Sequence, residues 1–305
     1  MRTEQGPTGV LLVTALAPIT WGTTYAVTTE LLPPDRPLLA ATLRALPAGI
    51  ALVAVTGARP PAGWWGRIAV LGTLNVGAFF ALLFVAATRL PGGVAATLGA
   101  IQPLVVAGLG ALLLGERVRS RTVVAGALGI VGVGLLVLRS RVGLDAVGVA
   151  AGVAGTLSMA TGVVLTKRWG RAMPLLAATG WQLVAGGLVL APLLLVVEGL
   201  PPTLTATNLA GHVWLATAGT AGAYVVWFRG VERLPVQRVS LLGLLSPLVA
   251  TTVGWLVLHQ RLTGGQVAGA LLVLLALRIG QGRVRTPAPV PARPALGGPV
   301  LEPTS

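Results

Sequence analysis

Long uninterrupted apolar runs are the feature that most limits what this chain can fold into. Stretches such as LLVTALAPITWGTTYAV (11–27) and VAGALGIVGVGLLVL (124–138) contain no charged residue. A helix needs about 20 mostly apolar residues to cross a bilayer, whereas the strands of a membrane barrel alternate apolar and polar residues. The runs therefore predict an all-α membrane protein rather than a barrel.

Composition supports the same class. Hydrophobic residues make up 54% of the 305 residues and charged residues only 10%, with a mean hydropathy of +0.86. Because an ordinary soluble domain is about a quarter charged, this chain lacks the residues for a fully polar surface. Cysteine is absent, which excludes disulfides, thiolate metal ligands and a thiol nucleophile.

Ten apolar runs are long enough to be predicted as transmembrane helices. They cover residues 10–29, 37–56, 68–88, 92–114, 122–138, 145–166, 175–197, 209–228, 239–258 and 263–280. The first run is too long for the core of a signal peptide. It is therefore predicted to be a retained helix.

The net charge of +14 would favour a nucleic-acid partner in a soluble protein, but its distribution indicates topology instead. With the N-terminus inside, the inner segments hold Arg2, Arg59, Arg67, Arg117, Arg119, Arg121, Lys167, Arg168, Arg171, Arg229, Arg233, Arg238, Arg278, Arg283, Arg285 and Arg293. The outer segments hold only Arg36, Arg89, Arg139, Arg141 and Arg261. This positive-inside bias predicts cytoplasmic termini and no nucleic-acid partner.

Short repeats divide the chain into two halves. The hexapeptide PLLAAT occurs at 37–42 and again at 174–179, and VAGAL occurs at 124–128 and 267–271. The segment FVAATRLPGGVAATLGAIQPLV (84–105) resembles FRGVERLPVQRVSLLGLLSPLV (228–249), with Arg-Leu-Pro and a later Pro in register. The matches keep the same order, so one unit of five spans is predicted to occur twice.

Five spans are an odd number, so the second unit must enter the membrane from the opposite side. The two halves are therefore predicted to be inverted relative to each other. Inverted repeats are typical of secondary transporters, in which two pseudo-symmetric halves rock about a site near the midplane.

The first half contains TWGTTYAV, LRALPAGIAL, RLPGGVAATLGAIQPLV and LLLGERVRSRTVVAGALGIVGVGLL in succession. This succession resembles the EamA-type repeat of the drug/metabolite transporter superfamily, over about residues 8–280. The resemblance implies ten helices in two inverted five-helix halves, and export or exchange of small metabolites such as amino acids. In the second half His259-Gln260-Arg261 stands where the first half has Gly115-Glu116-Arg117. We expect repeats at 8–139 and 145–280, followed by a disordered cytoplasmic tail at 281–305 that is rich in proline.

Arg44 is the one formal charge well inside a predicted span, about 10 Å deep at 1.5 Å per residue. A charge at this depth is costly and is a functional candidate by default. Two interpretations remain open: Arg44 binds a substrate carboxylate, or it clamps backbone carbonyls between helices.

Polar and aromatic residues in other spans are predicted to complete the substrate site. Pro103 and Pro247 lie in the matching repeat segments and predict broken helices, which mark transporter sites when they occur in both halves. Polar and aromatic residues at helical spacing in the first span, among them Trp21 and Tyr25, have two possible roles. They contact the substrate, or they form hydrogen bonds between helices. The full set of candidate substrate-binding residues is Trp21, Thr24, Tyr25, Arg44, Asn75, Phe79, Gln102, Trp181, Gln182, Tyr224, Trp227 and Ser246.

Other functional classes are less well supported by the sequence. An intramembrane enzyme needs an activated nucleophile, and the embedded serines have no embedded His or carboxylate beside them. A channel usually shows a charged ring or filter loop, and a receptor remains a further alternative. No catalytic residue, metal site or cofactor is expected, and Glu116 is expected to pair with a nearby Arg.

The chain is thus expected to be a multi-pass carrier in the bacterial inner membrane. Its expected partners are the lipid bilayer and a small molecule, with an amino-acid-like compound preferred and purine-like or drug-like compounds as alternatives. The expected state is a monomer or weak homodimer.

Overall fold

The computed structural model describes residues 7–90, 92–137, 145–257, 259 and 261–281, and every regular element in these ranges is a helix. Eight helical segments there are long and apolar enough to cross a membrane. They are Thr8–Leu31, Pro37–Thr56, Trp65–Leu83, Ala96–Leu114, Ser120–Val137, Ala146–Trp169, Leu175–Glu198 and Val236–Leu256. The protein is therefore a multi-span membrane protein. The predicted tail lies almost wholly outside the described residues.

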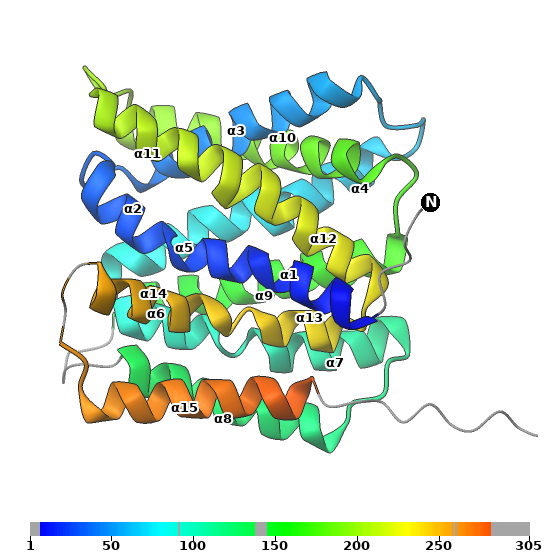
Figure 1. The fold of residues 1–305 in the computed structure, drawn as a ribbon. Coiled ribbons are helices and arrows are strands. Elements are labelled where there is room, and N and C mark those ends of the chain that lie inside the picture. The colour runs from blue at the N-terminus through cyan, green and yellow to red at the C-terminus, as the bar shows by residue number, and fades with distance from the viewer. Residues whose placement is uncertain (1–6, 91, 138–144, 258, 260, 282–305) are drawn as a thin grey trace, which may run out of the picture.

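The helices run roughly parallel across the molecule (Figure 1). In chain order they are α1 (Pro7–Gly22), α2 (Thr24–Leu31), α3 (Pro37–Thr56), α4 (Trp65–Gly72), η1 (Thr73–Gly77), α5 (Ala78–Arg89), α6 (Gly92–Gly99), α7 (Gln102–Leu114), α8 (Ser120–Val137), α9 (Ala146–Trp169), α10 (Leu175–Leu193), η2 (Leu194–Glu198), α11 (Ala206–Ala216), η3 (Thr217–Gly222), α12 (Ala223–Arg233), α13 (Val236–Leu242), α14 (Leu245–Leu256) and α15 (Gly264–Gly280). The segments labelled η are π-helical turns.

Three of the predicted spans are broken. The first divides at Thr23 between α1 and α2, the fourth divides between α6 and α7, and the ninth divides between α13 and α14. Pro103 and Pro247 lie in the first turns of α7 and α14. Proline is tolerated there because a first-turn N–H has no intrahelical acceptor, so each break comes just before its proline.

Two π-helical turns interrupt helices at corresponding places. η1 begins at Thr73 between α4 and α5, and η3 begins at Thr217 between α11 and α12. These starts differ by 144 residues (217 − 73), the same offset that aligns Phe84 with Phe228 in the sequence. π turns inside α-helices occur often at functional sites, so η1 and η3 mark candidate positions for such a site.

Glycines allow the closest helix contacts. α8 packs along α15, at the lower edge of the view in Figure 1, and α3 packs along α10. A Cβ added at Gly269 would lie 2.6 Å from the Gly132 carbonyl oxygen and 2.8 Å from Leu136 N. Small residues at such contacts let the helix backbones approach closely. This packing matters in a membrane, because the hydrophobic effect contributes little to the association of helices there.

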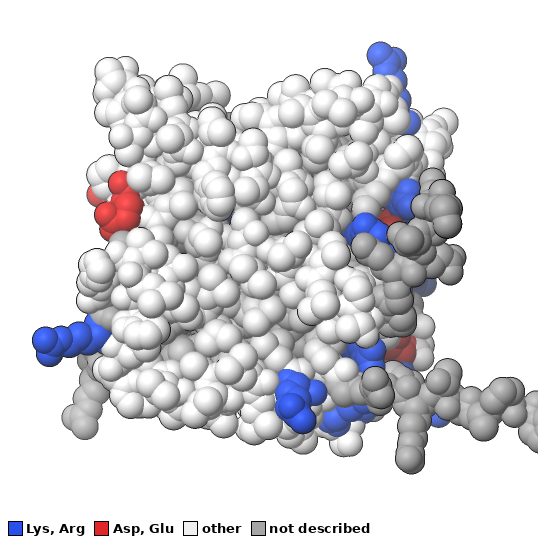
Figure 2. Space-filling view, viewed as in Figure 1, with Lys and Arg blue, Asp and Glu red and all other residues white. Residues whose placement is uncertain are grey.

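The main core lies between the halves, and the outer surface suits lipid. Tyr224, Trp227 and Phe228 of α12 are its largest buried side chains. Leucine and valine side chains such as Leu112 and Val196 are exposed on the outside. Figure 2 shows most charged residues toward the left and right ends of the visible face and a further basic group near the middle of its lower edge, with uncharged residues over the rest. This is the distribution that a bilayer-embedded surface requires.

Candidate functional site

Arg44 lies in the interior of the bundle and bridges two segments. Its side chain is on α3 and is only 7% exposed. Nε donates to the Thr220 hydroxyl at 2.9 Å, and Nη2 donates to the Gly219 carbonyl oxygen at 3.0 Å. The guanidinium also lies over the ring of Phe80, 4.9 Å from its centroid, a cation–π arrangement. Arg44 therefore ties α3 to η3.

An aromatic cluster lies beside this clamp. Trp21 of α1 donates from Nε1 to the same Gly219 carbonyl oxygen at 3.1 Å. Its ring lies 5.5 Å from that of Tyr224 and 5.1 Å from that of Trp227, between centroids. The Trp21–Tyr224 pair has edge-to-face geometry, which is favourable for two aromatic quadrupoles. Trp21, Tyr224 and Trp227 thus form an aromatic wall next to the buried cation.

Asn75 joins this wall to a second polar group. It is fully buried in η1, and its Nδ2 donates to Thr166 Oγ1 at 3.1 Å and to Gln182 Oε1 at 3.0 Å. Tyr224 Oη donates to the Asn75 carbonyl oxygen at 3.3 Å. A Cβ at Gly162 would collide with Asn75 Oδ1, so glycine is needed there. The network connects η1, α9, α10 and α12.

Four of the residues nominated from the sequence, two of them in the groups just described, keep a buried polar atom without a protein partner. The atoms are Thr24 Oγ1, Asn75 Oδ1, Gln102 Nε2 and Trp227 Nε1. Buried polar atoms in proteins are nearly always hydrogen-bonded, so each exception needs an explanation such as water or a ligand. Other buried atoms without a partner lie in residues that the sequence did not nominate, such as Thr42 and His212.

A recess opens toward one end of the bundle, beneath the Asn75 network. Its interior has a volume of about 20 Å³, which is room for about one water molecule. Its apolar lining includes Ile68, Leu71 and Leu175, and its polar lining includes Thr166, Thr179 and Gln182, with Arg171 and Glu232 also lining it. Because Thr166 and Gln182 also bind Asn75, the recess reaches the central network.

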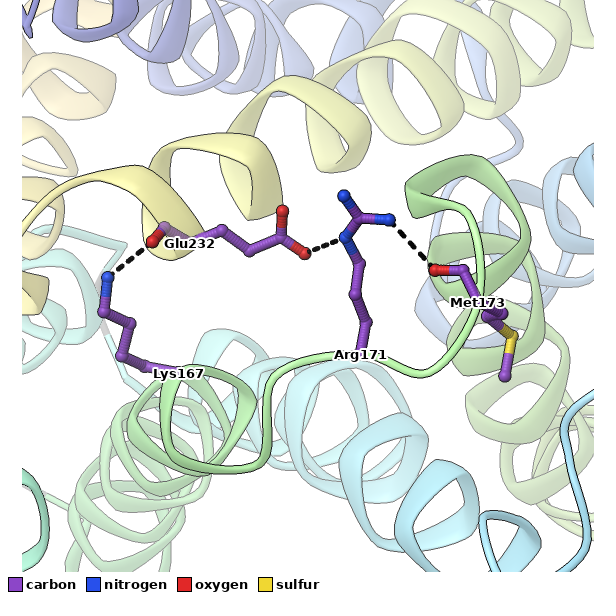
Figure 3. Close-up of polar contacts among 4 residues, drawn as sticks. All are labelled: Lys167, Arg171, Met173 and Glu232. Atoms are coloured by element: carbon purple, nitrogen blue, oxygen red, sulfur yellow. Dashed lines mark hydrogen bonds and ion pairs between the residues drawn. The ribbon is translucent and has the colours of Figure 1, made fainter.

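Charged side chains converge where this recess opens. Figure 3 shows Lys167 and Arg171 on either side of Glu232. Arg171 Nε contacts Glu232 Oε1 at 2.6 Å, and Arg171 Nη1 donates to the Met173 carbonyl oxygen at 3.0 Å. Lys167 Nζ donates to the carbonyl oxygens of Glu232 and Leu234 at 2.6 and 3.1 Å.

The opposite end of the bundle is closed by a different contact. Glu198, at the end of η2, accepts hydrogen bonds from the backbone N–H groups of Leu38 and Leu39 at 2.6 and 3.0 Å. Arg36 donates to the carbonyl oxygens of Glu198 and Gly199 at 3.2 and 3.1 Å. The carboxylate caps the N-terminus of α3, where unsatisfied N–H groups attract negative charge.

The structure does not bring all sequence-nominated residues together. Trp181 points away from Gln182 and donates from Nε1 to the Ala58 carbonyl oxygen at 2.9 Å, with its ring against Trp65. Phe79 is half-buried against the ring of Phe80, 5.5 Å away between centroids. Ser246 and Gln102 lie in the first turns of α14 and α7. The side chain of Tyr25 lies outside the described part of the structure.

The sequence did not nominate three groups that the network uses. Gly219 and Thr220 receive the Arg44 hydrogen bonds, and Thr166 receives one from Asn75. The run TAGTAG (217–222) consists of small and hydroxyl-bearing residues. Such a composition is equally typical of a helix face that packs against another helix, so the sequence alone did not mark it as part of a site. Glu116, expected to pair with an Arg, instead accepts from the N–H of Val236 at 3.3 Å.

Comparison with known proteins identifies the family. The model of the EamA-like transporter family matches residues 7–138 and again residues 146–279. The chain belongs to this family. The family is one of transporters, and one of the relatives described below is named a probable efflux pump, which indicates a transporter rather than an enzyme.

Two curated relatives and one solved structure extend this assignment. Protein PecM of Dickeya dadantii (strain 3937) is 50% identical over 267 residues, which cover 87% of this chain and 90% of PecM. A probable amino-acid metabolite efflux pump of Salmonella typhimurium is 27% identical over 275 residues, covering 87% and 92%. A crystal structure at 20% identity has a TM-score of 0.77 and covers 90% of this chain and 96% of that one, which shows the shared fold.

The described residues hold no group of three His, Asp or Glu side chains arranged to bind a metal ion. The polar groups that converge in the interior are instead amides, hydroxyls, indoles and one guanidinium. Groups of these kinds, beside an aromatic wall, are those with which small-molecule sites orient a ligand.

Proposed function

We propose that this protein is a secondary transporter that exports or exchanges a small metabolite across the bacterial inner membrane by alternating access. It has ten transmembrane helices in two inverted five-helix halves, 8–139 and 145–280. Besides the eight long apolar segments, α11–η3–α12 forms the eighth span and the shorter α15 forms the tenth. Its positive-inside charge distribution supports cytoplasmic termini, so the recess between Arg171 and Glu232 opens on the cytoplasmic side.

One observation carries the proposal: the interruptions of the two halves correspond and the polar network lies beside them. η1 and η3 occupy matching positions, and so do the breaks before α7 and α14. Asn75 lies in η1, and the acceptors of Arg44 lie in η3. Irregular helices at corresponding places in inverted halves support a binding site near the midplane.

The substrate class follows from the groups around this site. Arg44 is the one buried charged side chain among the described residues, and it favours an acid group. The Trp21, Tyr224 and Trp227 rings favour an apolar or aromatic body. An amino-acid-like compound has both, and the name of the Salmonella relative, an amino-acid metabolite efflux pump, supports this choice.

In this proposal Arg44 has two roles at different stages of the cycle. In the closed arrangement its guanidinium holds α3 against η3. When the halves separate, the same planar group is released to form a paired contact with a substrate carboxylate, for which guanidinium geometry is well suited.

The proposed function is tested by a binding screen followed by a flux measurement. A metabolite library is screened for compounds that raise the melting temperature of the purified protein, since selective binding to the native state stabilises it. Compounds selected in this way should enter proteoliposomes that contain the protein faster than protein-free liposomes. If no selected compound crosses faster, the protein is not their transporter.

A further inference from the structure

We infer that an anionic phospholipid binds at the end of the bundle where α8, α13 and α15 meet. Its headgroup phosphate is held by Arg119 and Arg121 from the first half and by Arg238 from the second. The bound lipid therefore links the two halves at this end. In the proposed topology this end is cytoplasmic, but the lipid site does not depend on the transport function.

Side-chain hydrogen bonds bring the arginines of the two halves together. Gln237 of α13 donates from Nε2 to the Arg117 carbonyl oxygen at 3.3 Å. The Thr122 hydroxyl of α8 donates to Gln237 Oε1 at 3.1 Å. Because Thr122 follows Arg121 in the sequence and Gln237 precedes Arg238, these bonds fix the two arginine-bearing segments beside each other.

The arrangement concentrates positive charge. Arg119 and Arg121 act electrostatically on Arg238, and Arg121 and Arg238 are half-buried, so water screens their repulsion only in part. Arg119 and Arg121 also flank the first residue of α8, whose positive helix end disfavours cations. The carboxylate nearest to them in the sequence, that of Glu116, accepts from the Val236 N–H. A phosphate between the arginines would relieve the repulsion.

The repeat does not place such a cluster at both ends. The offset of 144 that aligns 84–105 with 228–249 pairs Arg238 with Val94, and the offset between the VAGAL copies (267 − 124 = 143) pairs Arg121 with Gly264. The matching corner of the other half therefore lacks both charges. The positive-inside bias places arginines at one end, but it does not require arginines of both halves to converge there.

The same elements expose apolar side chains that suit acyl chains. Val123 and Val124 of α8 and Leu275 of α15 are exposed. α8 packs along α15, and Gln281 at the end of α15 donates from Nε2 to the Arg238 carbonyl oxygen at 2.8 Å. Figure 2 shows basic side chains beside uncharged surface at the lower right of the visible face, close to where α15 ends in Figure 1.

The chemistry of this surface fits an anionic phospholipid better than its alternatives. Guanidinium groups bind phosphate oxygens through paired, charge-assisted hydrogen bonds, and basic groups between helices at the cytoplasmic interface bind anionic headgroups. A zwitterionic headgroup adds a cation to its phosphate, which the arginines would repel. A free phosphate ion would leave the apolar side chains without a partner.

The test uses the purified full-length protein in a neutral detergent and three probes: dioleoyl phosphatidylglycerol, dioleoyl phosphatidylcholine and inorganic phosphate. Phosphatidylglycerol is anionic, phosphatidylcholine has the same chains without net charge, and inorganic phosphate has the charge without chains. Affinities are measured from the concentration dependence of the melting temperature. We expect phosphatidylglycerol to bind roughly tenfold or more tightly than phosphatidylcholine, and inorganic phosphate to give no shift at the same concentrations.

The variants remove charge from each half in turn. Arg238→Gln should weaken binding of phosphatidylglycerol roughly fivefold, and Arg119→Gln with Arg121→Gln should weaken it further. Arg121→Lys with Arg238→Lys keeps the charges and should retain most of the binding, which separates recognition from misfolding. Arg59→Gln with Arg168→Gln is the matched control, because these exposed arginines lie on other elements at the same proposed side and their loss should leave binding unchanged.

Equal binding of the two lipids, or a shift with inorganic phosphate as large as that with phosphatidylglycerol, would overturn the lipid site. An equal loss in the control pair would also overturn it, because general attraction to a basic surface would then explain the binding. Full binding by Arg238→Gln would contradict the link between the halves. None of these results bears on transport, which the proteoliposome flux measurement tests separately.

Discussion

Arg44 and Gly219 are 175 residues apart in the sequence, yet Nη2 of Arg44 donates to the Gly219 carbonyl oxygen at 3.0 Å. Trp21 donates to the same oxygen at 3.1 Å. One carbonyl of the π-helical turn η3 therefore holds both α1 and α3. If η3 moves, these hydrogen bonds must break, or α1 and α3 must move with it. Because Arg44 belongs to the first half and Gly219 to the second, the buried cation lies where the two halves meet.

Arg44→Lys should weaken this clamp. A lysine has one nitrogen and cannot bind Thr220 and Gly219 in the geometry of a guanidinium. Loss of one charge-assisted hydrogen bond should lower the free energy of unfolding by about 1.5–3 kcal/mol. Binding of an acid ligand should fall more than binding of its matched amide, as measured by melting-temperature titration.

Thr220→Val provides the matched control for this prediction. It removes the acceptor of Arg44 Nε and leaves the guanidinium in place, so it should lower stability while preserving the preference for the acid. Equal loss of acid and amide binding in Arg44→Lys, with a lowered melting temperature, would leave Arg44 with a structural role alone.

Glu198→Gln should loosen the opposite end of the bundle. The carboxylate accepts from Leu38 N and Leu39 N at the start of α3, and removing a helix cap costs about 0.5–2 kcal/mol. Hydrogen exchange of these two amides should become faster than in the wild type. Asp145→Asn is a useful comparison because Asp145 caps its own helix through Gly148 N. If exchange at the start of α3 is unchanged, the Glu198 contact does not stabilise that end.

Gly269→Ala should disrupt the packing of α15 on α8. The added methyl group would lie 2.6 Å from the Gly132 carbonyl oxygen and 2.8 Å from Leu136 N, and overpacking of this kind costs about 1–3 kcal/mol. Gly264→Ala, at the start of the same helix, meets nothing within 4 Å and should be tolerated. Similar melting temperatures for the two variants would contradict the close contact.

The helical runs were readable from the sequence because burial in a bilayer requires long apolar segments. The predicted run 37–56 coincides with α3, Pro37–Thr56. The π-helical turns were not predicted, since a residue inserted into a helix leaves the apolar content unchanged. Pro103 indicated a break near the start of α7. The sequence did not show that α7 begins at Gln102, one residue before that proline.

The site was harder to predict because adjacent helical residues point in different directions. Trp181 and Gln182 were nominated together, and only Gln182 reaches Asn75. Gly219 was not nominated because its contribution is a backbone carbonyl, which every residue carries. Partners of this kind are visible only when the helices are placed in space.

The inverted arrangement predicts opposite locations for two reporter fusions. A reporter fused after Arg141 follows five spans and should be periplasmic, whereas one fused after Arg285 follows ten and should be cytoplasmic. Paired phosphatase and fluorescent-protein fusions at each position measure this directly. Both fusions on the same side would rule out ten spans in inverted halves.

Counterflow in proteoliposomes tests the central claim, alternating access, most directly. Liposomes containing the purified protein are loaded with an unlabelled compound chosen by the stability screen and are then diluted into a trace of the labelled compound. A carrier that returns faster when loaded should accumulate label transiently above equilibrium, with saturable dependence on concentration. Label that only equilibrates, at a rate independent of the internal compound, would contradict alternating access and indicate a channel. Absence of any protein-dependent entry would contradict transport itself.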